Sequence, residues 1–187
     1  MGYRGPEVIL KIASYSKTEA QLRDYMSSIP HDGELNLTFS DGMFFFYTDI
    51  AIDCICDWCG DVNPMTWRYG QRGRPSRITA NMILTVKGAN REELEKGTNT
   101  FLEKCFPNHD WAIATHCSPQ PTIYLMIRNL GNDGRRLHIP RGQIYEWRKA
   151  FAQALQEHGV KADANTRYRK KAENTEGSAS NAEKSSE

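Results

Sequence analysis

The run Trp111-Ala-Ile-Ala-Thr-His-Cys117 is followed, after the link Ser118-Pro-Gln-Pro121, by a second run, Thr122-Ile-Tyr-Leu-Met-Ile-Arg128. Both runs are dominated by apolar residues, many of them β-branched or aromatic, and the link between them is short and contains proline. This arrangement is typical of two adjacent antiparallel strands. We expect the rest of the fold to be organised around this pair.

A turn and an amphipathic helix follow the second run. The segment Asn129-Leu-Gly-Asn-Asp-Gly134 consists largely of residues that tolerate a positive φ, which indicates a turn. Apolar residues then recur at i, i+3, i+7, i+10 and i+11, at Ile144, Trp147, Phe151, Ala154 and Leu155. This spacing predicts one buried stripe of a helix, and Gly159 occupies the position expected of a C-cap glycine.

The first half of the chain mixes strand and helix patterns. Alternating or β-branched runs predict strands over 7–13, 35–39, 43–47 and 78–86. Helices are predicted over 16–28, 48–60 and 90–105. Ser16 with Glu19, and Asn90 with Glu93, have the spacing of capping boxes and predict the starts of two of these helices.

Length and composition predict one globular domain with a polar tail. The chain has 187 residues and is 39% hydrophobic, which suffices for one core of ordinary size. After Lys161 the apolar pattern stops, and such a composition cannot offset the cost of ordering the backbone, roughly 1–2 kcal/mol per residue. We therefore assign 1–162 to the domain and 163–187 to a disordered tail with a basic cluster, Arg167-Tyr-Arg-Lys-Lys171.

The composition also bears on location and partners. There is no apolar run near 18 residues and no charged-then-apolar N-terminal segment, so we expect no membrane span or secretory signal. The five cysteines are odd in number, which suits a reducing compartment, and a cytoplasmic protein is expected. The formal net charge is only +1, so nucleic-acid binding would depend on local basic clusters.

One segment, 61–77, combines arginines with aromatic residues. Guanidinium groups contact phosphates and aromatic rings stack on bases, which is the combination that single-stranded DNA binders use. The alternative is a solvated basic loop. The predicted DNA-binding residues here are Trp67, Arg68, Tyr69, Arg72, Arg74 and Arg77, and Arg135 and Arg136, which follow the second central strand, could extend the phosphate contacts.

The C-terminal half resembles a known family in the order of its motifs. The two central strands are followed by Asp133-Gly-Arg-Arg-Leu137 and by the helix segment Glu146-Trp-Arg-Lys-Ala-Phe-Ala152. This order resembles the nuclease domain of plasmid-mobilisation relaxases (MobA/VirD2-like), which belong to the HUH single-strand endonucleases. The resemblance implies an α/β (α+β) two-layer sandwich, with an antiparallel sheet of about five strands and helices packed on one face.

The metal motif of that family is only partly present. Relaxases carry a histidine at the end of the first central strand and a His-Pro-His-x-His run at the second, where this chain has His116 and Gln120-Pro-Thr-Ile-Tyr124. The resemblance thus leaves His116 as a remnant metal ligand, with Thr122 and Tyr124 at the two lost ligand positions. A hydroxyl or a phenol does not compete with imidazole for a divalent ion. We expect no cofactor, or Mg²⁺ or Mn²⁺ if the site is functional.

The resemblance also places the tyrosine nucleophile of relaxases at Tyr25. In the family, this hydroxyl attacks a phosphodiester and leaves a 5′-phosphotyrosyl link. Each assignment has a structural alternative: Tyr25 can be a core tyrosine on its helix, and His116 a strand-end histidine bonded to its neighbours. The run Cys54-Ile-Cys-Asp-Trp-Cys59 lacks the paired C-x-x-C units of zinc sites, so we interpret these cysteines as small buried hydrophobic residues.

Three functions follow from these observations. The first is a relaxase-like protein that binds single-stranded or origin-of-transfer DNA, with nicking activity weak or lost. The second is an active relaxase that uses Tyr25 with a non-standard cation site. The third is a non-catalytic subunit that keeps the fold as a docking surface for other transfer proteins.

Overall fold

The computed structural model describes residues 5–30, 36–46, 48–61, 77–117 and 119–164. Its strands are β1 (Val8–Ser16), β2 (Leu37–Phe39), β3 (Phe44–Phe45), β4 (Thr79–Val86), β5 (Trp111–His116) and β6 (Thr122–Arg128). Its helices are α1 (Glu19–Ser27), α2 (Thr48–Cys56), α3 (Arg91–Cys105) and α4 (Gln143–Glu157), and a short 3₁₀ segment, η1 (Asp57–Asp61), continues α2. The predicted α+β class is confirmed.

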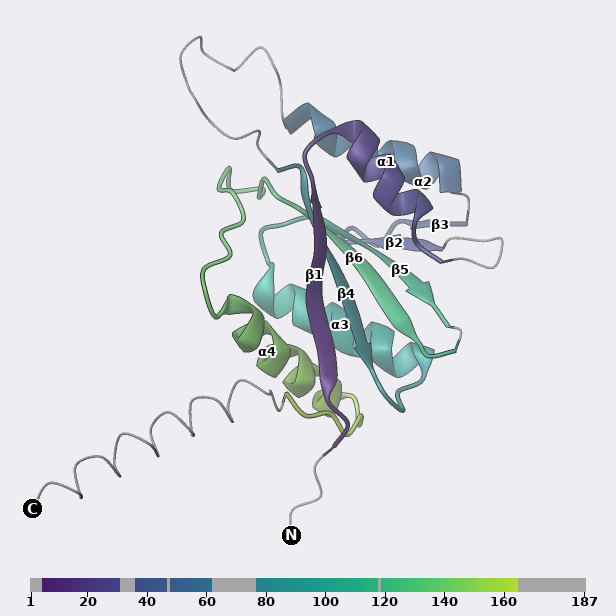
Figure 1. The fold of residues 1–187 in the computed structure, drawn as a ribbon, viewed down its shortest axis with the longest axis vertical. Coiled ribbons are helices and arrows are strands. Elements are labelled where there is room, and N and C mark those ends of the chain that lie inside the picture. Colours follow the sequence, from purple (N-terminus) through teal and green to yellow (C-terminus); the bar gives the residue numbers. More distant parts are fainter. Residues whose placement is uncertain (1–4, 31–35, 47, 62–76, 118, 165–187) are drawn as a thin grey trace, which may run out of the picture.

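The described strands form one antiparallel sheet in the order β1-β4-β6-β5-β2-β3 (Figure 1). The predicted central pair is confirmed: β5 and β6 are neighbours, with His116 opposite Thr122 and Trp111 opposite Ile127. The sheet of the described chain has six strands, as the local patterns predicted, whereas the family resemblance implied about five.

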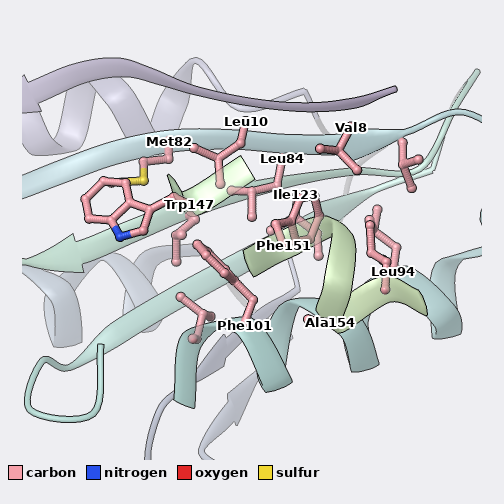
Figure 2. Packing of buried hydrophobic residues seen from close by; sticks show 14 of the residues in the cluster. Val8, Leu10, Met82, Leu84, Leu94, Phe101, Ile123, Trp147, Phe151 and Ala154 are labelled. Atoms are coloured by element: carbon pink, nitrogen blue, oxygen red, sulfur yellow. The ribbon is translucent and has the colours of Figure 1, made fainter. Parts of the chain in front are cut away.

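One hydrophobic core lies between the sheet and the helices α3 and α4. Figure 2 shows Leu10 of β1, Leu84 of β4 and Ile123 of β6 packed toward Phe101 of α3 and Phe151 of α4. The rings of Phe101 and Phe151 meet edge to face, with centroids 5.6 Å apart. The predicted helix stripe is confirmed, because Trp147, Phe151, Ala154 and Leu155 are all buried here.

A second core lies on the opposite face of the sheet, and it corrects one expectation. Leu22 and Met26 of α1 and Ile52 and Ile55 of α2 pack there with Met126 of β6. The helices were expected on one face only, in two layers, whereas α1 and α2 cover one face and α3 and α4 the other (Figure 1). The reason is that β5 and β6 are apolar on both faces, so both faces need a covering layer.

Two of the three predicted helix ends are confirmed and one is wrong. Asn90 and Glu93 form the expected capping box of α3, and Gly159 takes a φ of +84° just after α4. The helix predicted to begin at Ser16 instead begins after Thr18, whose hydroxyl accepts from the backbone N–H of Gln21. Ser16 is buried at the end of β1, because the strand runs three residues further than predicted.

The folded region extends to the last described residues. The backbone of Asp163 bonds to both Pro6 and Val8 beside the start of β1, and Ala162 is buried. The remainder of the predicted tail lies outside the described residues. Within the ranges described, no helix is long and apolar enough to cross a membrane.

Candidate nucleic-acid interface

The three positions that the resemblance assigns to metal ligands are neighbours on one face of the sheet. His116 and Thr122 are direct cross-strand partners, and Tyr124 lies two residues further along β6, opposite Ala114. Side chains alternate between faces along a strand, so all three project to the side on which Ala114 and Met126 enter the second core. All three are partly exposed, because α1 and α2 cover only part of this face.

Tyr25 and Tyr124 line a common cavity between α1 and the sheet. Its volume is about 620 Å³, and its lining contains Tyr124 but neither Thr122 nor His116. The polar and aromatic lining residues are Ser14, Tyr15, Ser16, Gln21, Asp24, Tyr25, Ser28 and Tyr124. The structure thus brings the candidate nucleophile next to one of the three expected ligand positions.

The environment of Tyr25 disfavours its ionised form. Its hydroxyl oxygen is buried and has no hydrogen-bond partner among the described residues. Burial raises the pKa of Tyr25 well above its ordinary value, and the neighbouring Tyr124 raises this pKa further. A tyrosine attacks a phosphodiester more readily when its hydroxyl is deprotonated, so this environment opposes nucleophilic attack.

The donor atoms on this face do not fit a divalent cation. His116 supplies one imidazole, while Thr122 donates its hydroxyl to the backbone carbonyl of Gln120 at 3.1 Å. In the described part of the chain, no group of three His, Cys, Asp or Glu side chains could hold a metal ion. The cysteines at 54, 56 and 59 do not form such a group either; they pack at the margin of the second core. A neutral hydroxyl and a phenol are poor substitutes for two imidazoles.

A buried hydrogen-bond network forms part of the wall of the cavity, and the sequence did not reveal it. The side-chain amide of Asn81 donates to the hydroxyls of Ser14 and Ser16 at 2.9 and 3.0 Å. The side-chain oxygen of Asn81 (Oδ1) accepts from the Thr79 hydroxyl at 2.8 Å. A bulge between Ile12 and Ser14 makes this possible, because the extra residue turns Ser14 and Ser16 toward α1.

Lys11 is a second residue that the sequence analysis missed. Leu10 and Ile12 face the first core, so Lys11 lies on the opposite face, where it is exposed. It pairs in register with Ile83, which pairs in turn with Tyr124. Lys11 therefore places a positive charge on the open part of the face that carries His116 and Tyr124.

The predicted basic residues divide into two groups. Trp67, Arg68, Tyr69, Arg72 and Arg74 lie outside the described residues. Arg77, Arg135 and Arg136 are described and exposed. Their segments meet at Asn129, whose backbone bonds to the backbone of both Ile78 and Leu137.

This group lies at one end of the sheet. Thr122 begins β6 and Asn129 follows its end, so the three arginines are separated from Thr122 and His116 by the length of the strand. Arg77 stacks on the ring of Tyr15, with its guanidinium carbon 3.7 Å from the ring centroid. The Tyr15 side chain packs against the first core, so Arg77 lies on the side of the sheet opposite Tyr25 and Tyr124.

Comparison with known proteins gives a match in structure but not in sequence. The sequence matches no protein-family model and no curated protein. Among solved structures, the fold is similar to that of the MobM relaxase domain (MOBV; Mob_Pre) bound to 26-nt pMV158 oriT DNA. The TM-score is 0.51 with 10% sequence identity, and the match covers 86% of this chain and 91% of that domain. The chain therefore has a relaxase-like fold.

Proposed function

We propose that this protein binds single-stranded or origin-of-transfer DNA in the mobilisation of a genetic element, and that its strand-nicking activity is weak or lost. The observation that carries the proposal is the fold, which matches a relaxase domain solved with oriT DNA over most of both chains. We further propose that the protein acts in the cytoplasm and that its partners include other transfer proteins.

The proposed DNA path follows the open face of the sheet. Lys11 and the partly exposed Tyr124 lie on this face, and Arg77 lies at the end of the sheet, just before β4. Lysine and arginine bind phosphates, and tyrosine rings offer a surface on which bases stack. Arg135 and Arg136 would continue the phosphate contacts at the end of β6.

Two features support loss of nicking. Charge builds on the phosphate oxygens during strand transfer, and a cation that would stabilise it needs better donors than one imidazole, one hydroxyl and one phenol. The pKa of Tyr25 is raised by burial, so little of its phenolate forms near neutral pH. Both features oppose the chemistry, whereas neither opposes binding.

A mobility-shift titration with a fluorescent single-stranded oligonucleotide tests the binding. We expect a shift that weakens with salt, because phosphate contacts release counterions. In the double variant Lys11→Gln/Arg77→Gln, the salt slope should fall by about 0.7 for each phosphate that is no longer neutralised. Lys149→Gln is the matched control, because Lys149 lies on α4 and pairs with Glu146. Absence of any shift at low salt would favour a docking subunit that does not touch DNA.

An adduct assay tests the chemistry. The oligonucleotide is incubated with the protein and Mg²⁺ or Mn²⁺, and covalent product is sought on a denaturing gel. We expect no adduct, or a trace of one. A strong adduct that disappears in Tyr25→Phe would instead establish an active relaxase and contradict the loss of nicking.

A further inference from the structure

An exposed apolar patch lies at the β3 edge of the molecule. It consists of Met43, Phe44, Phe46 and Ile50, which are 46%, 45%, 59% and 56% exposed. Among the described residues, the other exposed large apolar residue is Ile9, on β1 at the opposite edge of the sheet. Phe44 and Phe46 contact each other edge to face, with ring centroids 4.6 Å apart. Phe44 and Phe46 therefore form one continuous apolar surface, and Met43 and Ile50 lie at the same edge of the sheet.

The size of this patch fits the centre of a protein interface. With about 200 Å² for each large side chain, the exposed fractions amount to about 400 Å² of apolar surface. A segment that pairs with β3 and contacts both faces of this edge would cover this area, which corresponds to about 700 Å² per partner because apolar atoms make up a little over half of an ordinary interface. That is close to the roughly 800 Å² per partner of a specific complex.

The backbone of β3 offers a place for an added strand. In the described sheet, β3 is the last strand and pairs with β2 through Leu37 with Phe45 and Thr38 with Phe44. Phe45 turns inward against Phe39, so its neighbours Phe44 and Phe46 project to the other side. No lysine or proline occurs between 36 and 46 to block pairing at this edge.

The charge near the patch indicates which kind of molecule could bind there. The sequence from 36 to 61 contains five aspartates, at 41, 49, 53, 57 and 61, and no lysine or arginine. Asp53 is paired with Arg23, whereas Asp41 and Asp49 are exposed close to the patch in sequence. Carboxylates repel the phosphates of DNA, and two copies of this chain would bring like charges together. An apolar segment with basic side chains is complementary to this surface.

We propose that the β3 edge is a docking site for an extended segment of another protein in which apolar and basic side chains alternate. The segment would add as a strand beside β3, with its apolar side chains on Phe44 and Phe46 and its basic side chains toward Asp41 and Asp49. Because β3 is short, the side chains supply most of the affinity. The site lies at the far edge of the sheet from β1, so it is separate from the proposed DNA path and does not depend on it.

A labelled synthetic peptide that alternates Lys and Val tests this docking site on the full chain by fluorescence anisotropy. We expect saturable binding below about 1 mM that weakens with salt. An otherwise equal peptide that alternates Glu and Val should not bind. In Phe44→Ser/Phe46→Ser, the affinity should fall at least about tenfold, because this variant removes the hot-spot side chains. The control is Ile9→Ser, which removes an equally exposed apolar residue from the opposite edge.

Further measurements keep the proposal open to refutation. Asp41→Asn/Asp49→Asn leaves the apolar patch in place, and it should weaken peptide binding and reduce its salt dependence even if the double serine variant folds poorly. Equal binding of both peptides, or equal loss in Ile9→Ser, would overturn the proposal. So would a stable dimer in light scattering that the double serine variant dissociates, because the occupant would then be a second copy.

Discussion

Replacing Thr122 and Tyr124 with histidine should give this face of the sheet three neighbouring imidazoles that can bind a cation. Position 122 lies directly opposite His116 in the pairing of β5 with β6. Position 124 lies two residues further along β6 and on the same face of the sheet. Three imidazoles would then project from neighbouring positions on a partly exposed face. Imidazole nitrogens are good ligands for Zn²⁺, Ni²⁺ and Mn²⁺, and water can complete the coordination.

The geometry allows the expected effect to be estimated. Paired cross-strand residues have Cβ atoms about 4.5–5.5 Å apart, and residues two apart on one strand are about 6.6–6.8 Å apart. Flexible imidazole side chains can converge from these positions on one ion at about 2.0–2.1 Å. At a metal concentration of about 100 times the Kd, binding stabilises the folded state by about 2.7 kcal/mol. For a domain of this size, that raises the Tm by about 5–11 °C.

Thermal unfolding with and without metal measures this shift. Thr122→His/Tyr124→His should gain the full increase in Tm with Zn²⁺ and a smaller one with Mn²⁺, and EDTA should abolish both. The natural protein should show little change. The matched control adds His116→Ala to the double variant and should lose most of the metal effect, because the third ligand is missing.

The inferred arrangement of the face would be refuted by either of two results. The first is a double variant that folds but gains no stability from any of the three metals. The second is an equal metal effect in the presence and absence of His116, which would mean that positions 116, 122 and 124 do not share one site.

Three further predictions concern the core and the cavity. Asn81→Ala should lower the free energy of unfolding by about 2–3 kcal/mol in urea denaturation, because three partly or fully buried hydroxyls lose their partner. A decrease under about 0.5 kcal/mol would contradict the hydrogen-bond network. Gly97→Ala should cost about 1–3 kcal/mol in the same assay, because the new Cβ would lie 2.6 Å from the Cδ2 atom of Leu155, and Gly60→Ala, with open space around the new Cβ, is the control. Burial raises the pKa of Tyr25 above the unfolded value of about 10, so the unfolded state loses this proton first as the pH rises. The free energy of unfolding should therefore fall above about pH 10, by at most about 1.4 kcal/mol per pH unit from this group. Tyr25→Phe should remove that part of the slope, and an unchanged slope in denaturation curves between about pH 9 and 11 would show that Tyr25 is not the group responsible.

Local patterns in the chain were sufficient for most of the elements. The link from 118 to 121 is too short for anything but a tight connection, so β5 and β6 had to be antiparallel neighbours. The spacing of Trp147, Phe151 and Leu155 specifies a helix stripe in any globular context. Asn90 and Glu93 form a cap through bonds that span only three residues.

The end of β1 shows where local patterns were misleading. Ser16 and Glu19 have capping-box spacing, but Ser16 bonds instead with Asn81, 65 residues away. The bulge before Ser14 reverses which residues face each side of the strand, so simple alternation cannot be carried through it. The polar wall of the cavity follows from that reversal.

The candidate site was predictable as a set of positions but not as an environment. The resemblance to relaxases implies three ligand positions, and the residue identities show that only His116 carries an imidazole there. The burial of the Tyr25 hydroxyl, its proximity to Tyr124 and the position of Lys11 depend on how α1 lies on the sheet and on strand register. Helix and strand patterns arise from bonds a few residues apart and can be read along the chain. The polarity of a cavity arises from residues that meet only when distant segments pack, so the folded chain alone reveals it.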